Sequence, residues 1–268
     1  MMDLFTGREA SPMLIAQQME AFDSSEWIYE LKMDGFRCLA YMDRDGVDFR
    51  NKRNMQMLPK FPELRDVYQN AGDRCILDGE VVVLIDGVPD FYRLQKRTLL
   101  MDKFKIELES KRHPASFVAF DCLYKGREEL VWKPLMERKE ALAQLLQENP
   151  RIAISRYVET EGRALYRVAD EKELEGIVAK QKGSIYLMGK RTKDWIKFKR
   201  MADEEFIVTG YIQKGMHTFS LVLAKYKKGV LVYQGHVTAG VTKGDVMELA
   251  AVSKSPFHTI PAGNECAV

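Results

Sequence analysis

The stretch WIYELKMDGFR, residues 27–37, alternates between apolar and charged side chains with a period of two. Successive side chains of a β-strand point to opposite faces, so the stretch predicts a strand with one packed face and one charged face. The packed face would carry Trp27, Tyr29, Leu31 and Met33. The charged face would carry Glu30, Lys32 and Asp34. The Asp-Gly step favours a turn that holds the Lys32 amine at the mouth of a pocket; an ordinary exposed strand face is the alternative.

Further β-rich runs bounded by turn-forming residues lie outward from this stretch. They predict strands over residues 36–42, 75–85, 117–124, 176–181 and 195–199. Helical spacing of apolar residues predicts helices over 134–149 and 161–172. Strands and helices mix without regular βαβ alternation, which favours an α+β fold with antiparallel-rich sheets.

The pattern changes after Arg200. Alternating strands are predicted over residues 204–213, 218–229 and 230–240, with a short helix over 242–254. Short strands in this order are typical of an all-β oligonucleotide-binding (OB) fold, which needs five strands to close. We therefore expect a first domain over 1–200 and an OB-fold domain over 201–268 that is incomplete at its C-terminal end.

Composition excludes several classes of protein. The chain has 268 residues and a net charge of +2, and no apolar run is long enough to span a bilayer. The start of the sequence does not resemble a secretory signal, so a cytoplasmic protein is expected, in the nucleoid if the source is bacterial. The four cysteines lie far apart without metal-ligand spacing, and we expect buried free thiols at Cys38, Cys75, Cys122 and Cys266.

Lys32, Asp34, Gly35 and Arg37 form a K-x-D-G-x-R pattern that resembles the nucleotidyl-transfer motif of covalent nucleotidyltransferases. That superfamily contains ATP-dependent DNA ligases, RNA ligases and mRNA capping enzymes. Five further segments resemble its other motifs in order: FRNKRN (49–54), LDGEVVVL (77–84), FVAFDCLY (117–124), LEGIVAK (174–180) and DWIKFK (194–199). The similarity covers about residue 11 to the end and is closest to the ligase module of bacterial end-joining ligases of the ligase D type. It implies an ATP-grasp-like adenylation domain followed by an OB-fold domain.

The resemblance implies that Lys32 is the catalytic nucleophile, which takes AMP from ATP as a phosphoramidate. Lys197 and Lys199 share one face of their predicted strand and would contact the triphosphate, where clustered cations favour the neutral amine that attack requires. Glu175 would be the protein ligand of Mg²⁺, with Mn²⁺ as a substitute. A solvated basic strand and a surface acid are the alternative readings for these residues.

The resemblance also implies nucleotide contacts. Glu30 would lie near the adenine edge, Glu80 would hydrogen-bond the ribose, and Phe120 would stack on adenine, although a Phe in such a segment is normally a core residue. Arg37 and Arg50 are candidates for the sugar and for the DNA 5′-phosphate, because a guanidinium can bind two phosphate oxygens.

Two segments concentrate positive charge in a nearly neutral chain. Residues 180–200 hold eight Lys or Arg and one acid, and residues 93–112 hold seven and three. Such segments can bind DNA phosphates without reading sequence. A solvated surface is the alternative, most of all for the second segment.

These observations favour an ATP-dependent DNA ligase that seals 5′-phosphate/3′-hydroxyl breaks in duplex DNA through a lysyl-AMP intermediate. Nicked or broken DNA would be the substrate, a Ku-type end-binding protein a possible partner, and the protein a monomer. A GTP-dependent mRNA capping enzyme and a truncated DNA-binding relic are the alternatives. The hypothesis of a truncated relic rests on the end of the sequence at NECAV, which comes before any segment that resembles the family's final motif. No extra domain precedes Lys32, which disfavours an NAD-dependent ligase.

Overall fold

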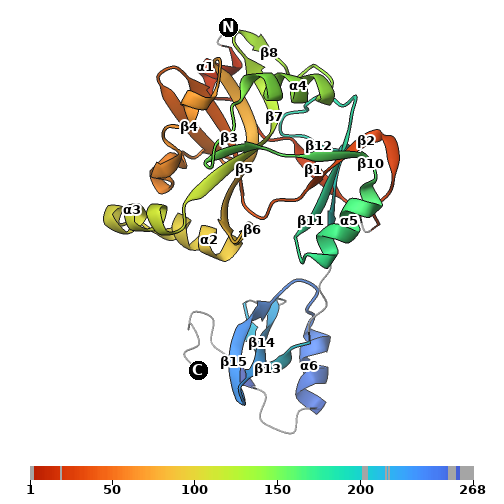
Figure 1. The fold of residues 1–268 in the computed structure, drawn as a ribbon. Coiled ribbons are helices and arrows are strands. Elements are labelled where there is room, and N and C mark those ends of the chain that lie inside the picture. The colour runs from red at the N-terminus through yellow and green to blue at the C-terminus, as the bar shows by residue number, and fades with distance from the viewer. Residues whose placement is uncertain are drawn as a thin grey trace. The chain divides into compact units, whose positions relative to one another are not determined.

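The computed structural model describes residues 3–18, 20–200, 205–214, 216, 218–252 and 258–259. Contacts divide the chain into two compact units, one ending at Arg200 and one beginning after it (Figure 1). The described part of the first unit contains two large sheets, and that of the second contains one smaller sheet with a helix. The mixed α+β class predicted from the sequence is confirmed.

The first sheet has the order β1-β12-β11-β2-β10. Its strands are β1 (Leu14–Gln17), β12 (Arg191–Lys199), β11 (Gly176–Gln181), β2 (Ser24–Leu31) and β10 (Tyr157–Thr160). All of its pairs are antiparallel except β1 with β12. One face packs on α5 (Gly162–Glu171), through a cluster that includes Tyr29, Ile177 and Phe198.

The second sheet has the order β4-β3-β5-β7-β8, with β6 paired to β5 and β9 paired to β7. Its strands are β3 (Phe36–Asp43), β4 (Gly46–Asn51), β5 (Cys75–Ile85), β6 (Val88–Pro89), β7 (Ala115–Lys125), β8 (Glu128–Glu129) and β9 (Ile152–Ile154). A hydrophobic cluster that includes Ile28 and Trp195 of the first sheet and Leu39 and Tyr41 of the second joins the two sheets. The two sheets therefore face each other across one core.

The remaining elements of the first unit are helical. They are α1 (Leu4–Gly7), α2 (Phe91–Leu99), α3 (Lys103–Arg112), α4 (Leu135–Leu145) and the 3₁₀ turns η1 (Leu58–Lys60), η2 (Pro62–Leu64) and η3 (Val67–Asn70). The predicted helix over 134–149 is confirmed but too long, because the chain becomes extended at Leu146, which forms a bridge with Ala71. The sequence reading missed α2 and α3, whose N-termini are capped by Asp90 and Asp102.

The second unit contains the three predicted strands and the predicted helix. These are β13 (Ile207–Gln213), β14 (Phe219–Lys227), β15 (Val230–Val237) and α6 (Lys243–Val252). A short strand that was not predicted, β16 (His258–Thr259), pairs with β13 in parallel. The assignment of this unit to the OB fold stays a prediction.

Two predictions drawn from composition can be compared with the structure. Cys38, Cys75 and Cys122 are buried free thiols, as expected, and Cys266 lies outside the described residues. Among the helices of the described residues, none is long and apolar enough to cross a membrane.

Candidate active site

Lys32 directly follows the last residue of β2, and the pairing of three strands determines its neighbours. Leu31 of β2 pairs with Ile177 of β11, and Gly176 pairs with Lys199 of β12. The backbone N–H of Lys32 donates to the carbonyl of Gly176 at 2.9 Å. This register brings Lys32, Glu175 and Lys199 together at the same end of three adjacent strands.

The carboxylate of Glu175 bridges two ammonium groups. Its Oε2 lies 2.7 Å from Nζ of Lys32, and its Oε1 lies 2.9 Å from Nζ of Lys199. Burial, followed by the positive charges of Lys199 and Lys32, lowers the pKa of the nearby Lys197. The structure thus brings together the proposed nucleophile, the proposed metal ligand and the two proposed triphosphate lysines.

Glu30 lies on the same face of the sheet but is buried in an ionic cluster. Its carboxylate accepts from Nζ of Lys180 at 3.0 and 3.1 Å, pairs with Lys139 of α4, and accepts from Oγ of Ser155 at 2.8 Å. Burial alone would raise the pKa of Glu30, but the two lysines hold it below its usual value. Burial lowers the pKa of Lys180 to about 8. The cluster therefore contains two amino groups that can carry a positive charge, those of Lys139 and Lys180, and one carboxylate, that of Glu30.

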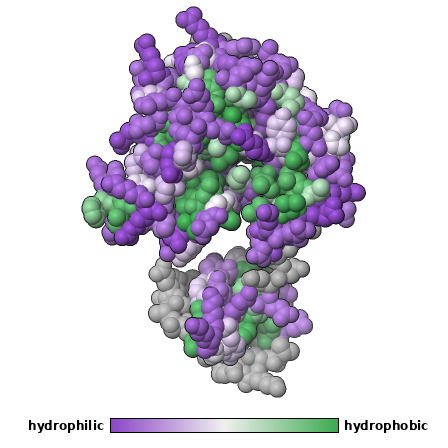
Figure 2. Space-filling model, in the orientation of Figure 1, coloured by the Kyte–Doolittle hydropathy of each residue, from purple (hydrophilic) through white to green (hydrophobic). Residues whose placement is uncertain are grey.

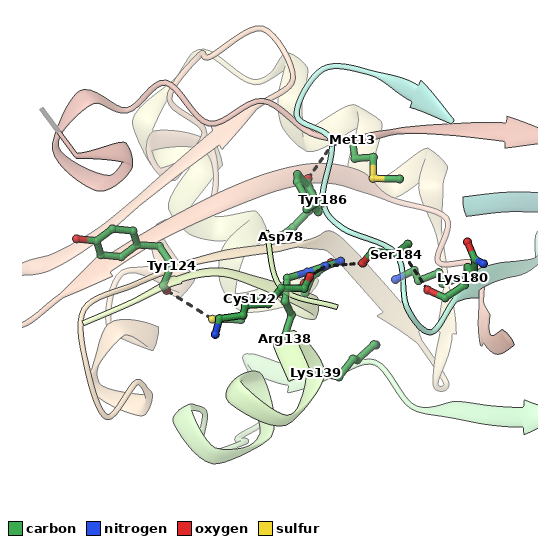
Figure 3. A network of polar contacts seen from close by, with 12 residues as sticks. Met13, Asp78, Cys122, Tyr124, Arg138, Lys139, Lys180, Ser184 and Tyr186 are labelled. Atoms are coloured by element: carbon green, nitrogen blue, oxygen red, sulfur yellow. Dashed lines mark hydrogen bonds and ion pairs between the residues drawn. The ribbon is translucent and has the colours of Figure 1, made fainter. Parts of the chain in front are cut away.

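Arg37 and Asp78 lie on neighbouring strands of the opposite sheet, β3 and β5. Nε and Nη2 of Arg37 donate to the two carboxylate oxygens of Asp78 at 3.0 and 2.6 Å, and Nη1 donates to the carbonyl of Met13 at 2.7 Å. The hydroxyl of Tyr186 donates to Asp78 at 2.6 Å and accepts from the N–H of Met13 (Figure 3). Arg37 is therefore held in place by protein groups, and its role in nucleotide binding stays a prediction.

Two further carboxyl groups interact electrostatically with Lys32. Glu80 pairs in register with Arg37 of β3, and desolvation raises its pKa to about 8. Desolvation, followed by repulsion from Glu175, raises the pKa of Asp34. Both groups are thus shifted towards the neutral form, in which a carboxyl group can donate a hydrogen bond.

Phe120 occupies a β-bulge. Asp78 pairs with Asp121 and Gly79 pairs with Ala119, so Phe120 is the extra residue on β7. Its half-buried ring meets Trp195 edge to face, with ring centroids 6.0 Å apart. The ammonium of Lys180 lies 4.2 Å from the centroid of each ring. Phe120 therefore packs against the core and also borders the charged face of the first sheet.

Arg50 lies apart from this cluster. It is on β4, where Nε donates to Asp48 at 2.8 Å and Nη1 donates to the carbonyl of Asn54 at 3.2 Å. No described contact joins it to Lys32 or Glu175. Its assignment to the DNA 5′-phosphate stays a prediction that the Lys32 cluster does not support.

Comparison with known proteins identifies the family. Residues 10–199 match the family model described as "ATP dependent DNA ligase domain". The chain belongs to the ATP-dependent DNA ligase family.

Individual ligases agree with this assignment. A Bacillus subtilis "SPbeta prophage-derived DNA ligase-like protein LigB" is 34% identical over 205 residues, which are 76% of this chain and 72% of that protein. A Pseudomonas aeruginosa "Multifunctional non-homologous end joining protein LigD" is 32% identical across 94% of this chain, which spans only 31% of that protein. The structure titled "mycobacterial DNA ligase D complexed with ATP and MES" matches with a TM-score of 0.65 and 25% identity, covering 97% of this chain and 84% of that one. The resemblance drawn from the sequence motifs is confirmed.

The sequence reading of this DNA ligase missed several side chains that support the site. The sequence could have indicated Asp78, because it lies two residues before Glu80 and therefore on the same face of β5. The sequence could also have indicated Lys139, because it lies four residues after Leu135 in the apolar stripe of α4, where a lysine must be buried. Tyr186 lies in an irregular segment, and no sequence pattern indicated it.

Proposed function

We propose that this DNA ligase seals 5′-phosphate/3′-hydroxyl breaks in duplex DNA and that Lys32 carries the AMP. The observation that supports this most directly is the contact of Lys32 with Glu175, together with Lys199 on the next strand but one. Nζ of Lys32 attacks the α-phosphorus of ATP, forms a P–N bond and releases pyrophosphate. The AMP then passes to the 5′-phosphate of the break, and the 3′-hydroxyl displaces it to form the phosphodiester.

The lysines of β12 are suited to stabilise the pyrophosphate that leaves in this reaction. Lys197 and Lys199 lie on the same face as Trp195 and Lys180, whereas Ile196 and Phe198 pack into the opposite core. Two fixed cations can neutralise the charge that develops on a departing pyrophosphate, and phosphoryl transfer depends mainly on such positioning and charge.

The carboxyl groups around Lys32 fit a divalent cation. Desolvation, with a smaller contribution from the negative charge of Glu175, raises the pKa values of Asp34 and Glu80, and a bound cation would favour the ionised form of both groups. Mg²⁺ prefers oxygen ligands and keeps several waters, and we propose Glu175 as its protein ligand. Among the described residues no three acidic, histidine or cysteine side chains converge on one point, so ATP oxygens and water would complete the shell. The ion would neutralise phosphate charge.

The nucleoside would lie between the two sheets. Phe120 offers an aromatic edge there, Glu80 a carboxyl group for the ribose and Glu30 a carboxylate near the base, whereas Arg37 would act from its pair with Asp78. A Ku-type partner, a monomeric state and a cytoplasmic or nucleoid location stay predictions. The family match favours ATP over the GTP of capping enzymes.

Adduct formation tests the proposal. With labelled ATP and Mg²⁺, or as purified, the protein should gain one AMP on Lys32, and labelled GTP should give none. Lys32→Arg should abolish the adduct, because a guanidinium stays charged, whereas Lys172→Arg, an exposed position after α5, should retain it. Lys32→Arg should still seal a pre-adenylated nick, which needs no lysine nucleophile. An adduct that persists in Lys32→Arg would overturn the assignment, and no adduct in any variant would favour a DNA-binding relic.

A further inference from the structure

The helices α2 and α3 flank a groove of about 610 Å³ in the first unit. Helical spacing puts its charged side chains on facing stripes: Arg93 and Lys96 on α2, Lys105 and Arg112 on α3. These residues belong to the positively charged segment over 93–112 that was noted in the sequence. The function proposed above assigns no role to this segment.

The groove is a fixed feature of the fold. Arg97 of α2 is buried, pairs with Glu63 of η2, and donates to the carbonyl of His113, the residue that ends α3. Nη1 of Arg93 lies 2.7 Å from Nε2 of the same histidine. These contacts fix α2 and α3 relative to each other, so the backbone of the groove needs little ordering when a ligand binds.

The charge on the groove is positive and partly uncompensated. Arg93 pairs with Asp90 at 3.1 Å, and Arg112 approaches Glu109 at 3.9 Å. Lys96 and Lys105 are exposed and have no ionic partner among the described residues. An anionic ligand would therefore find two free ammonium groups.

Exposed apolar rings accompany these cations. Tyr92, which lines the groove, and Phe104, which lies outside it on α3, are 64% and 76% exposed, and Nζ of Lys96 lies 4.3 Å from the centroid of the Tyr92 ring. Hydrophobic atoms lie among hydrophilic ones at the left of Figure 2, where Figure 1 places α3. Lys and Arg clustered on one face are typical of surfaces that bind nucleic acid.

The helix α2 begins near the segment that follows Lys32. Phe91, the first residue of α2, contacts Phe36 with ring centroids 5.5 Å apart. Phe36 follows the Lys32–Gly35 segment directly. The first turn of α2 is thus joined by a side-chain contact to the strand that follows Lys32.

We propose that the groove between α2 and α3 binds the phosphate backbone of the duplex that flanks the break, chiefly through Lys96 and Lys105. The proposal rests on the ligase function proposed above. Phosphate contacts of this kind hold a duplex in position without reading its sequence, which suits an enzyme that seals breaks at any sequence.

The salt dependence of DNA binding tests the groove. Binding of a labelled nicked duplex is measured over a KCl series for the wild type, for the double variant Lys96→Gln/Lys105→Gln, and for Lys111→Gln, an exposed lysine of α3 outside the groove. Each phosphate contact contributes roughly 0.9 to the slope of log K against log[salt], so the double variant should lose about 2 from the slope. Its affinity at low salt should fall roughly tenfold or more, and Lys111→Gln should match the wild type.

Two outcomes would overturn the groove proposal: an unchanged slope in the double variant, or an equal loss in Lys111→Gln. Lys32 adenylation without DNA reports on the integrity of each variant. A wild type that forms no adduct would overturn the proposed ligase mechanism instead, while the difference in slope between variants would still measure the groove.

Discussion

Nζ of Lys32 lies 2.7 Å from Oε2 of Glu175, and Oε1 of the same carboxylate lies 2.9 Å from Nζ of Lys199. In this arrangement the proposed nucleophile is an ammonium held in an ion pair. Attack on ATP requires a free electron pair on the amine, so the proposed mechanism requires Lys32 to leave this ion pair and to lose a proton before attack. The pair would therefore act as a resting state that the substrate opens.

The first prediction concerns Glu175→Gln. The neutral amide cannot bridge two ammonium groups and is a poorer ligand for Mg²⁺, so adenylation of Lys32 should fall roughly a hundredfold or more. Glu171→Gln, on the exposed surface of α5, is the matched control and should adenylate as the wild type does. The rate of adduct formation at saturating ATP and Mg²⁺ measures both. Wild-type rates in Glu175→Gln would mean that the acid is structural.

The second prediction uses the glycine that follows this acid. Gly176 has φ = +131°, and a Cβ there would overlap the carbonyl oxygen of Phe198 on β12. Gly176→Ala should shift β11 against β12, displace Glu175 from both lysines and slow adenylation at least tenfold. Gly183→Ala, where a Cβ meets open space, should have no effect. Equal adenylation rates in the two variants would contradict this view of the register.

The third prediction is a pH dependence of stability. The pKa of Glu80 rises from 4.5 to about 8 on folding, mainly through desolvation. Between these values the folded protein keeps a proton that the unfolded chain releases, so the contribution of Glu80 to the free energy of unfolding falls as pH rises. Glu80→Gln has no carboxyl group to titrate. Its free energy of unfolding relative to that of the wild type should therefore rise by roughly 1 to 3 kcal/mol between pH 5 and pH 8.

Urea unfolding of both proteins at several pH values measures that difference. Glu137→Gln, an exposed acid of α4, corrects for the removal of one carboxylate. A difference between Glu80→Gln and wild type that stays constant from pH 5 to pH 8 would show that Glu80 is ionised throughout.

The active-site face could be predicted from the sequence because strand periodicity determines it. Alternation in residues 27–37 and 195–199 was enough to separate Glu30, Lys32, Lys197 and Lys199 from the residues that pack against α5. The strands over 75–85 and 176–181 were predicted with the observed bounds. These strands are buried and are flanked by turn-forming residues, which makes their ends easy to read.

The contacts between side chains of elements far apart in the sequence could not be predicted in the same way. The pair of Arg37 with Asp78 joins residues 41 positions apart, and the approach of Lys139 to Glu30 depends on how α4 docks. The motif similarity made Arg37 and Arg50 candidates for the sugar and for the DNA 5′-phosphate, but it did not indicate that each would pair with an acid, Arg37 with Asp78 and Arg50 with Asp48. Periodicity describes one strand or helix at a time and does not specify the partners of its charged side chains.

The last prediction concerns the buried cluster of Glu30, Lys139 and Lys180. Glu30→Gln would leave two buried ammonium groups without an anion, and removal of one partner from a buried ion pair costs about 3 to 5 kcal/mol. Lys139→Met should cost less, because it leaves one cation with one anion and also removes the repulsion that, after burial, lowers the pKa of Lys180. Glu26→Gln, on the exposed part of the same strand, should be nearly neutral. Urea midpoints should therefore fall in the order Glu26→Gln, Lys139→Met, Glu30→Gln, and a Glu30→Gln protein as stable as Glu26→Gln would show that the lysines lose their protons instead.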